Sequence, residues 1–215
     1  MDHDLLPLFP LELVLLPEEH LPLHIFEDRY KTMIGECLQA KAVGRGQQEF
    51  GVVLLTGKVL STVGCTARIV NMTRKYEDGR MDILTIGSRR FEILLINNER
   101  PYLRGAVNNF DDEGPDTPSE PAAEIAISRF REIMKMLRDT ADTAVLLTRP
   151  YRYLSFRIAA ALPLDIEFKQ QLLTLRNEPE RLALVEGALD DLLAKIEHVQ
   201  ESQRKSGGNG RLRSV

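Results

Sequence analysis

The sequence contains little cysteine, with Cys37 and Cys65 as the two thiols among its 215 residues. Two cysteines are too few for a disulfide framework, and neither stands near a second residue that could help it hold a metal. A chain of this length can bury about 70% of its unfolded surface, so it can fold without cross-links. We therefore predict that both thiols are buried structural residues and that the protein holds no metal and no cofactor.

Long apolar runs and blocks of like charge are also missing. No window approaches the roughly 18 apolar residues of a membrane-spanning helix, and Asp2, His3 and Asp4 stand where a signal peptide would carry basic residues. The 28 basic and 32 acidic side chains give a net charge of −4 and are mixed along the chain, which does not favour nucleic acid as a partner. These absences predict a soluble, cytoplasmic protein with no membrane partner.

Motifs for nucleotide binding and covalent catalysis are absent from the sequence. The closest match to a phosphate-binding loop runs from Gly51 to Val59, but five residues instead of four separate Gly51 from Gly57. Val59 also replaces the hydroxyl residue that would contact magnesium. No glycine-flanked serine elbow occurs, and no spacing singles out a catalytic base. We therefore predict that the chain is not an enzyme.

His20 and His24 are four positions apart, a spacing that would place two imidazoles on one face of a helix. The residues between them do not form the H-E-x-x-H pattern, and Pro22 disfavours a helix. On a strand, at roughly 3.3 Å per residue, the two side chains would be about 13 Å apart. The pair is therefore not expected to share a metal ion.

Residues 5–110 carry the pattern of a β-domain, with short β-branched and aliphatic runs between turn signals. Asp78-Gly79 lies between two of these runs and predicts a tight hairpin, because both residues tolerate a positive φ. One helix, Asp28–Ala40, interrupts the strands, with apolar residues three and four apart. The predicted strands are Phe50–Leu55, Ala67–Tyr76, Met81–Ile86, Phe91–Ile96 and Leu103–Phe110.

Helical patterns replace strands in the second half of the chain. Residues 111–121 are acidic and rich in proline and contain no large apolar residue, which predicts a linker. Residues 122–200 have helical spacing, and Asn177 with Pro179 predicts the start of the last helix. Residues 201–215, rich in glycine and basic residues, predict a disordered tail.

The last predicted helix carries an unbroken apolar seam, which needs a partner helix. Its residues are alternately three and four positions apart, and they are Leu182, Val185, Leu189, Leu192, Ile196 and Val199. A partner within the same chain would be a small bundle that contains Ile158, Leu162, Phe168 and Leu172. The alternative is that the seam forms a homodimer or a docking surface.

Several short motifs resemble the amino-terminal domain of Lon proteases. Two apolar runs broken by prolines open the chain, with P-L-F-P-L at Pro7–Leu11 and L-P-L-H-I-F-E-D-R-Y at Leu21–Tyr30. Further along, Ile86–Ile93 reads I-G-S-R-R-F-E-I, and Ala160–Leu173 reads A-A-L-P-L-D-I-E-F-K-Q-Q-L-L. The likeness spans residues 5–195.

This resemblance implies both a fold and a function. The fold would be α+β, with a small PUA-like β-barrel and one early helix over residues 5–110, followed by an all-α helical bundle over residues 122–200. Domains of this family engage unfolded or damaged polypeptides. The expected function is therefore non-catalytic polypeptide binding in bacterial protein quality control or regulated proteolysis. The protein would deliver substrates to a separate protease, compete with the full-length enzyme or act as a holdase. The ATPase and Ser/Lys peptidase modules of a full Lon protease have no counterpart in these motifs.

Polypeptide binding would need an exposed apolar groove or a sheet edge. Candidate residues near turns or the linker are Tyr76, Tyr102, Leu103 and Phe110, and the alternative is that they close the barrel.

Two other functions stay open. PUA-like domains are often associated with RNA, and an RNA-binding module would need several basic side chains acting together on phosphates. The basic residues of the predicted hairpin, among which acidic residues also lie, are Arg68, Arg74, Lys75, Arg80, Arg89 and Arg90. The third function is a dimeric structural protein that uses the apolar seam.

Overall fold

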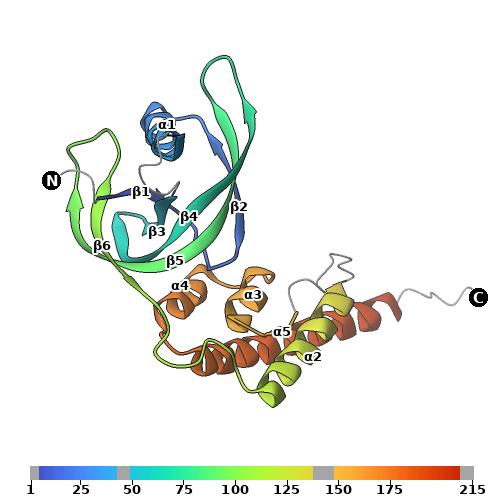
Figure 1. Cartoon of the computed structure of the whole chain (residues 1–215). Coiled ribbons are helices and arrows are strands. Elements are labelled where there is room, and N and C mark those ends of the chain that lie inside the picture. The colour runs from blue at the N-terminus through green and yellow to red at the C-terminus, as the bar shows by residue number, and fades with distance from the viewer. Residues whose placement is uncertain (1–4, 43–48, 138–147, 209–215) are drawn as a thin grey trace, which may run out of the picture. The chain divides into compact units, whose positions relative to one another are not determined.

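The protein combines a sheet with helices (Figure 1), and the computed structural model describes residues 5–42, 49–137 and 148–208. The strands are β1 (Leu6–Leu11), β2 (His20–Ile25), β3 (Glu49–Thr56), β4 (Val59–Lys75), β5 (Met81–Asn97) and β6 (Arg104–Phe110). The helices are α1 (Asp28–Ala42), α2 (Glu120–Leu137), α3 (Leu154–Ala160), α4 (Ile166–Thr174) and α5 (Glu178–Gly208). None of the described helices is long and apolar enough to cross a membrane.

The chain forms two compact units. Unit 1 consists of Met1–Glu113 together with Ala159–Arg176, and unit 2 consists of Gly114–Ile158 together with Asn177–Val215. The strands, α1 and α4 therefore lie in unit 1, whereas α2 and α5 lie in unit 2.

Five strands of unit 1 close into a barrel. β1 pairs in parallel with β3 and antiparallel with β6, and the antiparallel pairs β3–β4, β4–β5 and β5–β6 complete the ring. β2 lies outside this ring as an edge strand, and it pairs with β5 alone among the strands described. Pro22 in β2 lacks an N–H group, as suits an edge strand. The predicted α+β class with a small β-barrel is confirmed.

β4 and β5 form a hairpin with two strands of 17 residues each (Figure 1). The predicted Asp78-Gly79 turn joins them, with φ of 84° at Gly79 and a hydrogen bond of 2.9 Å from Tyr76 N to Arg80 O. The prediction of separate strands over residues 81–86 and 91–96 is wrong, because both belong to β5. Gly87 keeps the strand continuous, since it still pairs with Ala67 of β4.

Phe91 lies in the barrel core with Leu8 and Val53. Gly51 and Gly64 stand beside its ring, and a Cβ atom added to them would lie 2.5 Å and 2.6 Å, respectively, from the Cζ atom of Phe91. The two glycines therefore leave the space that the phenyl ring fills.

α1 matches the predicted helix and extends two residues beyond it. Its buried residues include Met33, Ile34 and Cys37, and Cys65 of β4 is also buried. Both thiols are free, as predicted. Burial raises the pKa of each thiol to about 12, so both stay protonated at neutral pH.

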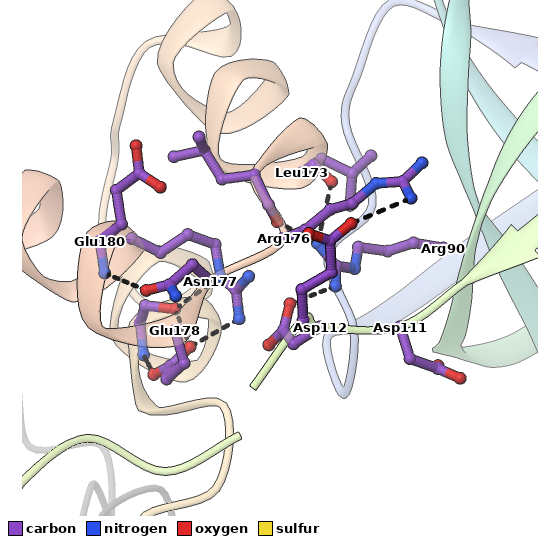
Figure 2. A network of polar contacts seen from close by, with 12 residues as sticks. Arg90, Asp111, Asp112, Leu173, Arg176, Asn177, Glu178 and Glu180 are labelled. Atoms are coloured by element: carbon purple, nitrogen blue, oxygen red, sulfur yellow. Dashed lines mark hydrogen bonds and ion pairs between the residues drawn. The ribbon is translucent and has the colours of Figure 1, made fainter. Parts of the chain in front are cut away.

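In unit 2, α2 and α5 pack against each other (Figure 1). Asn177 caps α5 as predicted, because its Oδ1 accepts a hydrogen bond of 3.0 Å from Glu180 N (Figure 2). The helix that packs along α5 is α2. Of the predicted partners, Ile158 lies in unit 2 with α5, whereas Leu162, Phe168 and Leu172 belong to unit 1. The predicted tail is wrong for residues 201–208, which continue α5, and residues 209–215 lie outside the described residues.

A buried polar network joins the starts of α3 and α5 within unit 2. Glu178 and Arg181 are fully buried and form an ion pair of 2.7 Å. Glu178 also accepts hydrogen bonds from the backbone N (2.9 Å) and Oγ (2.7 Å) of Ser155, and the guanidinium of Arg181 lies 4.2 Å from the Phe156 ring centre. Burial raises the pKa of Glu178, although its bonds to Ser155 and Arg181 act in the opposite direction.

Residues 159–176, which contain α4, belong to unit 1, and this differs from the predicted single helical domain over residues 122–200. One residue that holds this stretch to the barrel is Arg90 of β5, which is 4% exposed. Its Nη1 donates to the backbone oxygens of Leu173 (3.3 Å) and Leu175, and its Nη2 pairs with Asp112 at 2.5 Å (Figure 2). One buried guanidinium therefore holds the C-terminal end of α4 and the segment after β6.

Candidate functional site

Three of the four residues predicted to contact substrate are covered by other parts of unit 1. Tyr102 is buried and donates a hydrogen bond of 2.5 Å to Oε2 of Glu36, and burial together with this bond raises the pKa of Tyr102. Phe110 is buried, with the Arg176 guanidinium 4.4 Å from its ring centre. Leu103 packs against the core cluster around Phe91. These side chains therefore offer little surface to a partner.

Tyr76, the fourth predicted residue, lies half-buried at the end of the long hairpin. Its hydroxyl donates to Oδ2 of Asp82 at 2.9 Å, and Asp82 also accepts a hydrogen bond of 2.5 Å from Nδ1 of His24. The guanidinium groups of Arg74 and Arg80 lie 4.5 Å and 4.8 Å from the tyrosine ring centre. Tyr76 thus organises the hairpin end through contacts within the chain.

The Asp82 carboxylate should make the stability of unit 1 depend on pH. Its hydrogen bonds from His24 and then Tyr76 lower the pKa of Asp82 below the ordinary 3.8. The stabilisation is therefore present above pH 3.8 and is lost as the pH falls through the lower folded value. We expect Asp82→Asn to flatten the loss of stability in this acid range, measured by urea unfolding at a series of pH values.

Thr73 provides the control for this prediction, because its hydroxyl donates a hydrogen bond of 3.1 Å to the backbone oxygen of Asp82 and does not ionise. Thr73→Val should therefore leave the acid dependence unchanged. If Asp82→Asn has the same slope against pH as the wild-type protein, the hydrogen-bonded carboxylate does not contribute as described.

Three of the six basic residues of the predicted RNA-binding hairpin are buried or paired with acidic residues of the chain. Arg90 is buried, and Arg89 pairs with Asp111 at 3.1 Å. Arg80 pairs with Asp78 at 2.7 Å. These partners offset part of the positive charge on which phosphate binding depends, whereas Arg68, Arg74 and Lys75 are exposed.

An exposed apolar strip lies on β5, and we call Leu94, Leu95 and Ile96 the β5 strip. The three side chains are 60%, 72% and 54% exposed. A register shift in the β5–β6 ladder falls between Ile93 and Leu95, where Leu94 is the extra residue of a bulge. Adjacent exposed apolar side chains of this kind mark interaction surfaces.

The β5 strip also lies on an open strand edge. Residues 93–97 pair with β6 along one edge, whereas pairing with β4 ends at Val63 and Glu92. Within the described ranges, no strand pairs with the other edge of this stretch. Such an edge can present backbone N–H and C=O groups to an added strand. The sequence signal for this surface is the run of four consecutive aliphatic residues, Ile93–Ile96, at the end of a predicted strand.

A pocket of about 290 Å³ is a second candidate site in unit 1. Its apolar walls are Leu13, Val14, Leu15, Leu21, Leu164 and Ile166. Glu19 and Lys169 complete the lining with charges of opposite sign, and 3.7 Å separates Oε1 of Glu19 from Nζ of Lys169. The arrangement offers an apolar space with one acceptor and one donor beside it.

Backbone contacts fix the acidic side of this pocket. Glu19 Oε2 accepts a hydrogen bond of 2.8 Å from Leu16 N, and Glu19 O accepts one of 2.9 Å from Gly87 N. The neighbouring Glu18 has φ of 64° and donates its N–H to Gly87 O at 2.9 Å. Burial raises the pKa of Glu19, while Leu16 and Lys169 act in the opposite direction.

The predicted interaction seam of α5 is divided by exposure. Leu182, Val185 and Leu189 are buried, whereas Leu192 and Ile196 are partly exposed. The first part of the seam therefore contributes to the core of unit 2, and only the second part retains surface for a partner.

Comparisons with known proteins agree with the fold and extend over most of the chain. Residues 5–191 match the family model of the ATP-dependent protease La (LON) substrate-binding domain. Lon protease 2 of Herpetosiphon aurantiacus is 29% identical over 213 residues, which cover 93% of this chain and 26% of that protein. Lon protease of Parabacteroides distasonis is 29% identical over 195 residues, 83% of this chain and 23% of that protein. The chain thus spans about a quarter of these relatives.

Solved structures give the same result for the fold. A Lon N-terminal domain protein from Xanthomonas campestris has a TM-score of 0.65 and 25% identity, covering 84% of this chain and 96% of that one. The N-terminal domain of a Mycobacterium avium complex Lon protease has a TM-score of 0.65 and 16% identity, covering 87% and 98%. With its family match over residues 5–191, the chain belongs to the Lon protease substrate-binding domain family.

Proposed function

We propose that this protein binds extended segments of unfolded polypeptide and does not hydrolyse them. The observation that carries the proposal is the β5 strip, where three exposed aliphatic side chains lie on a strand edge that no described strand covers. Membership of the Lon substrate-binding domain family supports a polypeptide as the ligand.

The physical basis would be strand addition. An extended segment can donate and accept backbone hydrogen bonds along residues 93–97, while its side chains pack on the β5 strip. Backbone pairing does not depend on sequence, so this mode suits a partner that is defined by being unfolded. Burial of Leu95, which is 72% exposed in the free protein, would add apolar stabilisation.

The role in the cell would be recognition in protein quality control. The family model that matches describes the substrate-binding domain of Lon proteases, and we propose that hydrolysis is the task of a separate protease. Under this proposal the chain selects unfolded polypeptides in the cytoplasm and delivers them or holds them.

Leu95→Lys should weaken polypeptide binding by about tenfold or more, because it removes an apolar contact of the size of one leucine side chain. The measurement is fluorescence anisotropy with a reduced, alkylated and fluorescein-labelled polypeptide that stays unfolded. Ile125→Lys is the matched control, since Ile125 is an exposed aliphatic residue on α2, away from the β5 strip and outside the seam of α5.

Salt dependence separates this function from RNA binding. Polypeptide binding through the β5 strip should survive moderate salt, whereas binding of single-stranded RNA would fall steeply as salt rises. Equal affinity of the Leu95→Lys and wild-type proteins would remove the β5 strip from the proposal. Binding of RNA alone would contradict the proposal as a whole.

A further inference from the structure

The pocket beside Glu19 and Lys169 has the composition of a site for one apolar side chain. Six aliphatic residues from two distant stretches of unit 1, residues 13–21 and 164–166, form its walls. Its volume of about 290 Å³ is at the lower limit for ligand pockets. Aliphatic walls cannot offer hydrogen bonds to a polar group, and a polar group buried there would lose its bonds to water.

The charged pair at the pocket is only loosely engaged. The side chains of Glu19 and Lys169 are 20% and 16% exposed, and their closest atoms are 3.7 Å apart, which is longer than a charge-assisted hydrogen bond. Oε2 of Glu19 is already engaged by Leu16 N, so Oε1 is the oxygen that faces Lys169. Oε1 of Glu19 can therefore accept one hydrogen bond from a ligand, and Nζ of Lys169 can donate one. The two side chains together carry no net charge.

A peptide backbone matches this arrangement better than a charged group does. Each residue of a polypeptide carries one N–H donor and one C=O acceptor and has no charge. A carboxylate at Lys169 would also lie near Glu19, whose charge has the same sign and would repel it. A backbone amide is uncharged, so Glu19 does not repel it, and its N–H and C=O can bond to Glu19 and Lys169, respectively.

We propose that this pocket receives one aliphatic or aromatic side chain of a bound polypeptide, whose backbone N–H donates to Glu19 and whose C=O accepts from Lys169. The inference rests on the proposed function, because it assumes a polypeptide ligand. The pocket would give the protein a preference for certain side chains in the polypeptide, which strand addition at the β5 strip does not provide. Strand addition accepts any extended segment, whereas the pocket selects segments with a bulky apolar residue.

Short peptides with blocked ends test the preference directly. Fluorescein-labelled glycine–serine peptides would carry leucine, phenylalanine, serine or aspartate at the central position. We expect the leucine and phenylalanine peptides to bind the wild-type protein at least about tenfold more tightly than the serine peptide, as burial of one apolar side chain implies. The aspartate peptide should bind no better than the serine peptide.

Two variants locate the preference. Leu164→Trp places a larger side chain in the pocket wall and should abolish the preference for leucine, whereas Ile125→Trp on α2 should not change it. Lys169→Met keeps most of the side-chain volume. It should lower the affinity for the leucine peptide about fivefold or more, because a hydrogen bond from a charged group is lost. Lys135→Met, at an exposed lysine of α2, is its control.

Methyl NMR of the wild-type protein tests the site without a variant, in case Leu164→Trp does not fold. The leucine peptide should shift the methyl signals of Leu13, Leu21 and Leu164, which line the pocket. The signals of Leu94 and Leu95 should shift less, because a short peptide pairs weakly with the β5 strip.

The outcomes separate this inference from the proposed function. If the unfolded polypeptide binds but the leucine and serine peptides bind equally, the pocket inference is wrong and the proposed function stands. If Leu164→Trp folds and keeps the preference, the pocket is not its source. If only a peptide with a free C-terminal carboxylate binds, and Lys169→Met abolishes that binding, the pocket recognises a chain terminus and the backbone contact is wrong. If the unfolded polypeptide itself does not bind, the proposed function fails.

Discussion

Replacing Gly87 with alanine should lower the free energy of unfolding by about 3 kcal/mol, at the upper end of the usual cost of overpacking. A Cβ atom at this position would lie 2.0 Å from Leu16 O and 2.9 Å from the carbonyl carbon of Leu16. Both are backbone atoms, so no side chain can move aside. The backbone of Gly87 is also tied on both sides, because its N–H donates to Glu19 O and its C=O accepts from Glu18 N.

Urea unfolding of unit 1, monitored by circular dichroism, measures this effect. Gly35→Ala is the matched control, because a Cβ atom at Gly35 in α1 meets nothing within 4 Å. In a helix, alanine should raise stability by about 0.5–1 kcal/mol over glycine. Glycine to alanine should therefore lower the free energy of unfolding at position 87 and raise it at position 35. A stability of Gly87→Ala within error of the wild type would show that β5 and the segment before β2 can separate freely.

Loss of the Arg90 guanidinium is the second substitution with a large expected effect. Arg90→Met should destabilise the protein by about 3–5 kcal/mol, the cost of removing one partner from a buried ion pair. The side chains of Arg90 and Asp112 are 4% and 2% exposed, so water cannot replace the guanidinium easily. The backbone oxygens of Leu173 and Leu175 lose their donor in the same step.

Arg89, the preceding residue, gives an internal control for Arg90. Its ion pair with Asp111 joins side chains that are 52% and 67% exposed, and exposed pairs contribute about 0–1 kcal/mol. Arg89→Met should therefore have a small effect in the same thermal or urea unfolding experiment. If the two variants lose equal stability, burial does not determine the contribution of Arg90. The double variant Arg90→Met/Asp112→Leu should recover part of the loss, because it no longer leaves a buried carboxylate without that partner.

Local chemistry in the sequence was enough to predict much of the fold. Asp78-Gly79 predicted the hairpin turn because few other residue pairs accept positive φ, and Gly79 has φ of 84°. Asn177 predicted the start of α5 because its side chain can accept the N–H of Glu180. These features depend on residues close together in the chain, and no knowledge of the tertiary structure was needed.

Features that depend on distant residues could not be predicted in this way. Arg90 was predicted only as one of the basic residues of the hairpin, and no local pattern singles out Arg181, but both side chains are buried with partners. The candidate pocket contains Glu19 and Lys169, which are 150 positions apart in the chain. No local pattern around either residue indicates that the two side chains are close together. Gly87 lies between two strands that were predicted to be separate, Met81–Ile86 and Phe91–Ile96, but it continues β5 and Leu16 approaches its backbone closely.

The division of the chain into units has a consequence for its covalent connectivity. Unit 1 is encoded in two separate stretches, residues 1–113 and 159–176, and the chain passes from one unit to the other at three points. A gene fragment that ends in the acidic segment after β6 would produce a barrel without the acceptors of Arg90 on Leu173 and Leu175. A single cut in that segment, in contrast, would leave both stretches of unit 1 in contact. Unit 1 is therefore noncontiguous in the sequence although all of its strands lie in the first stretch, and a gene fragment that encodes the complete unit must contain both stretches.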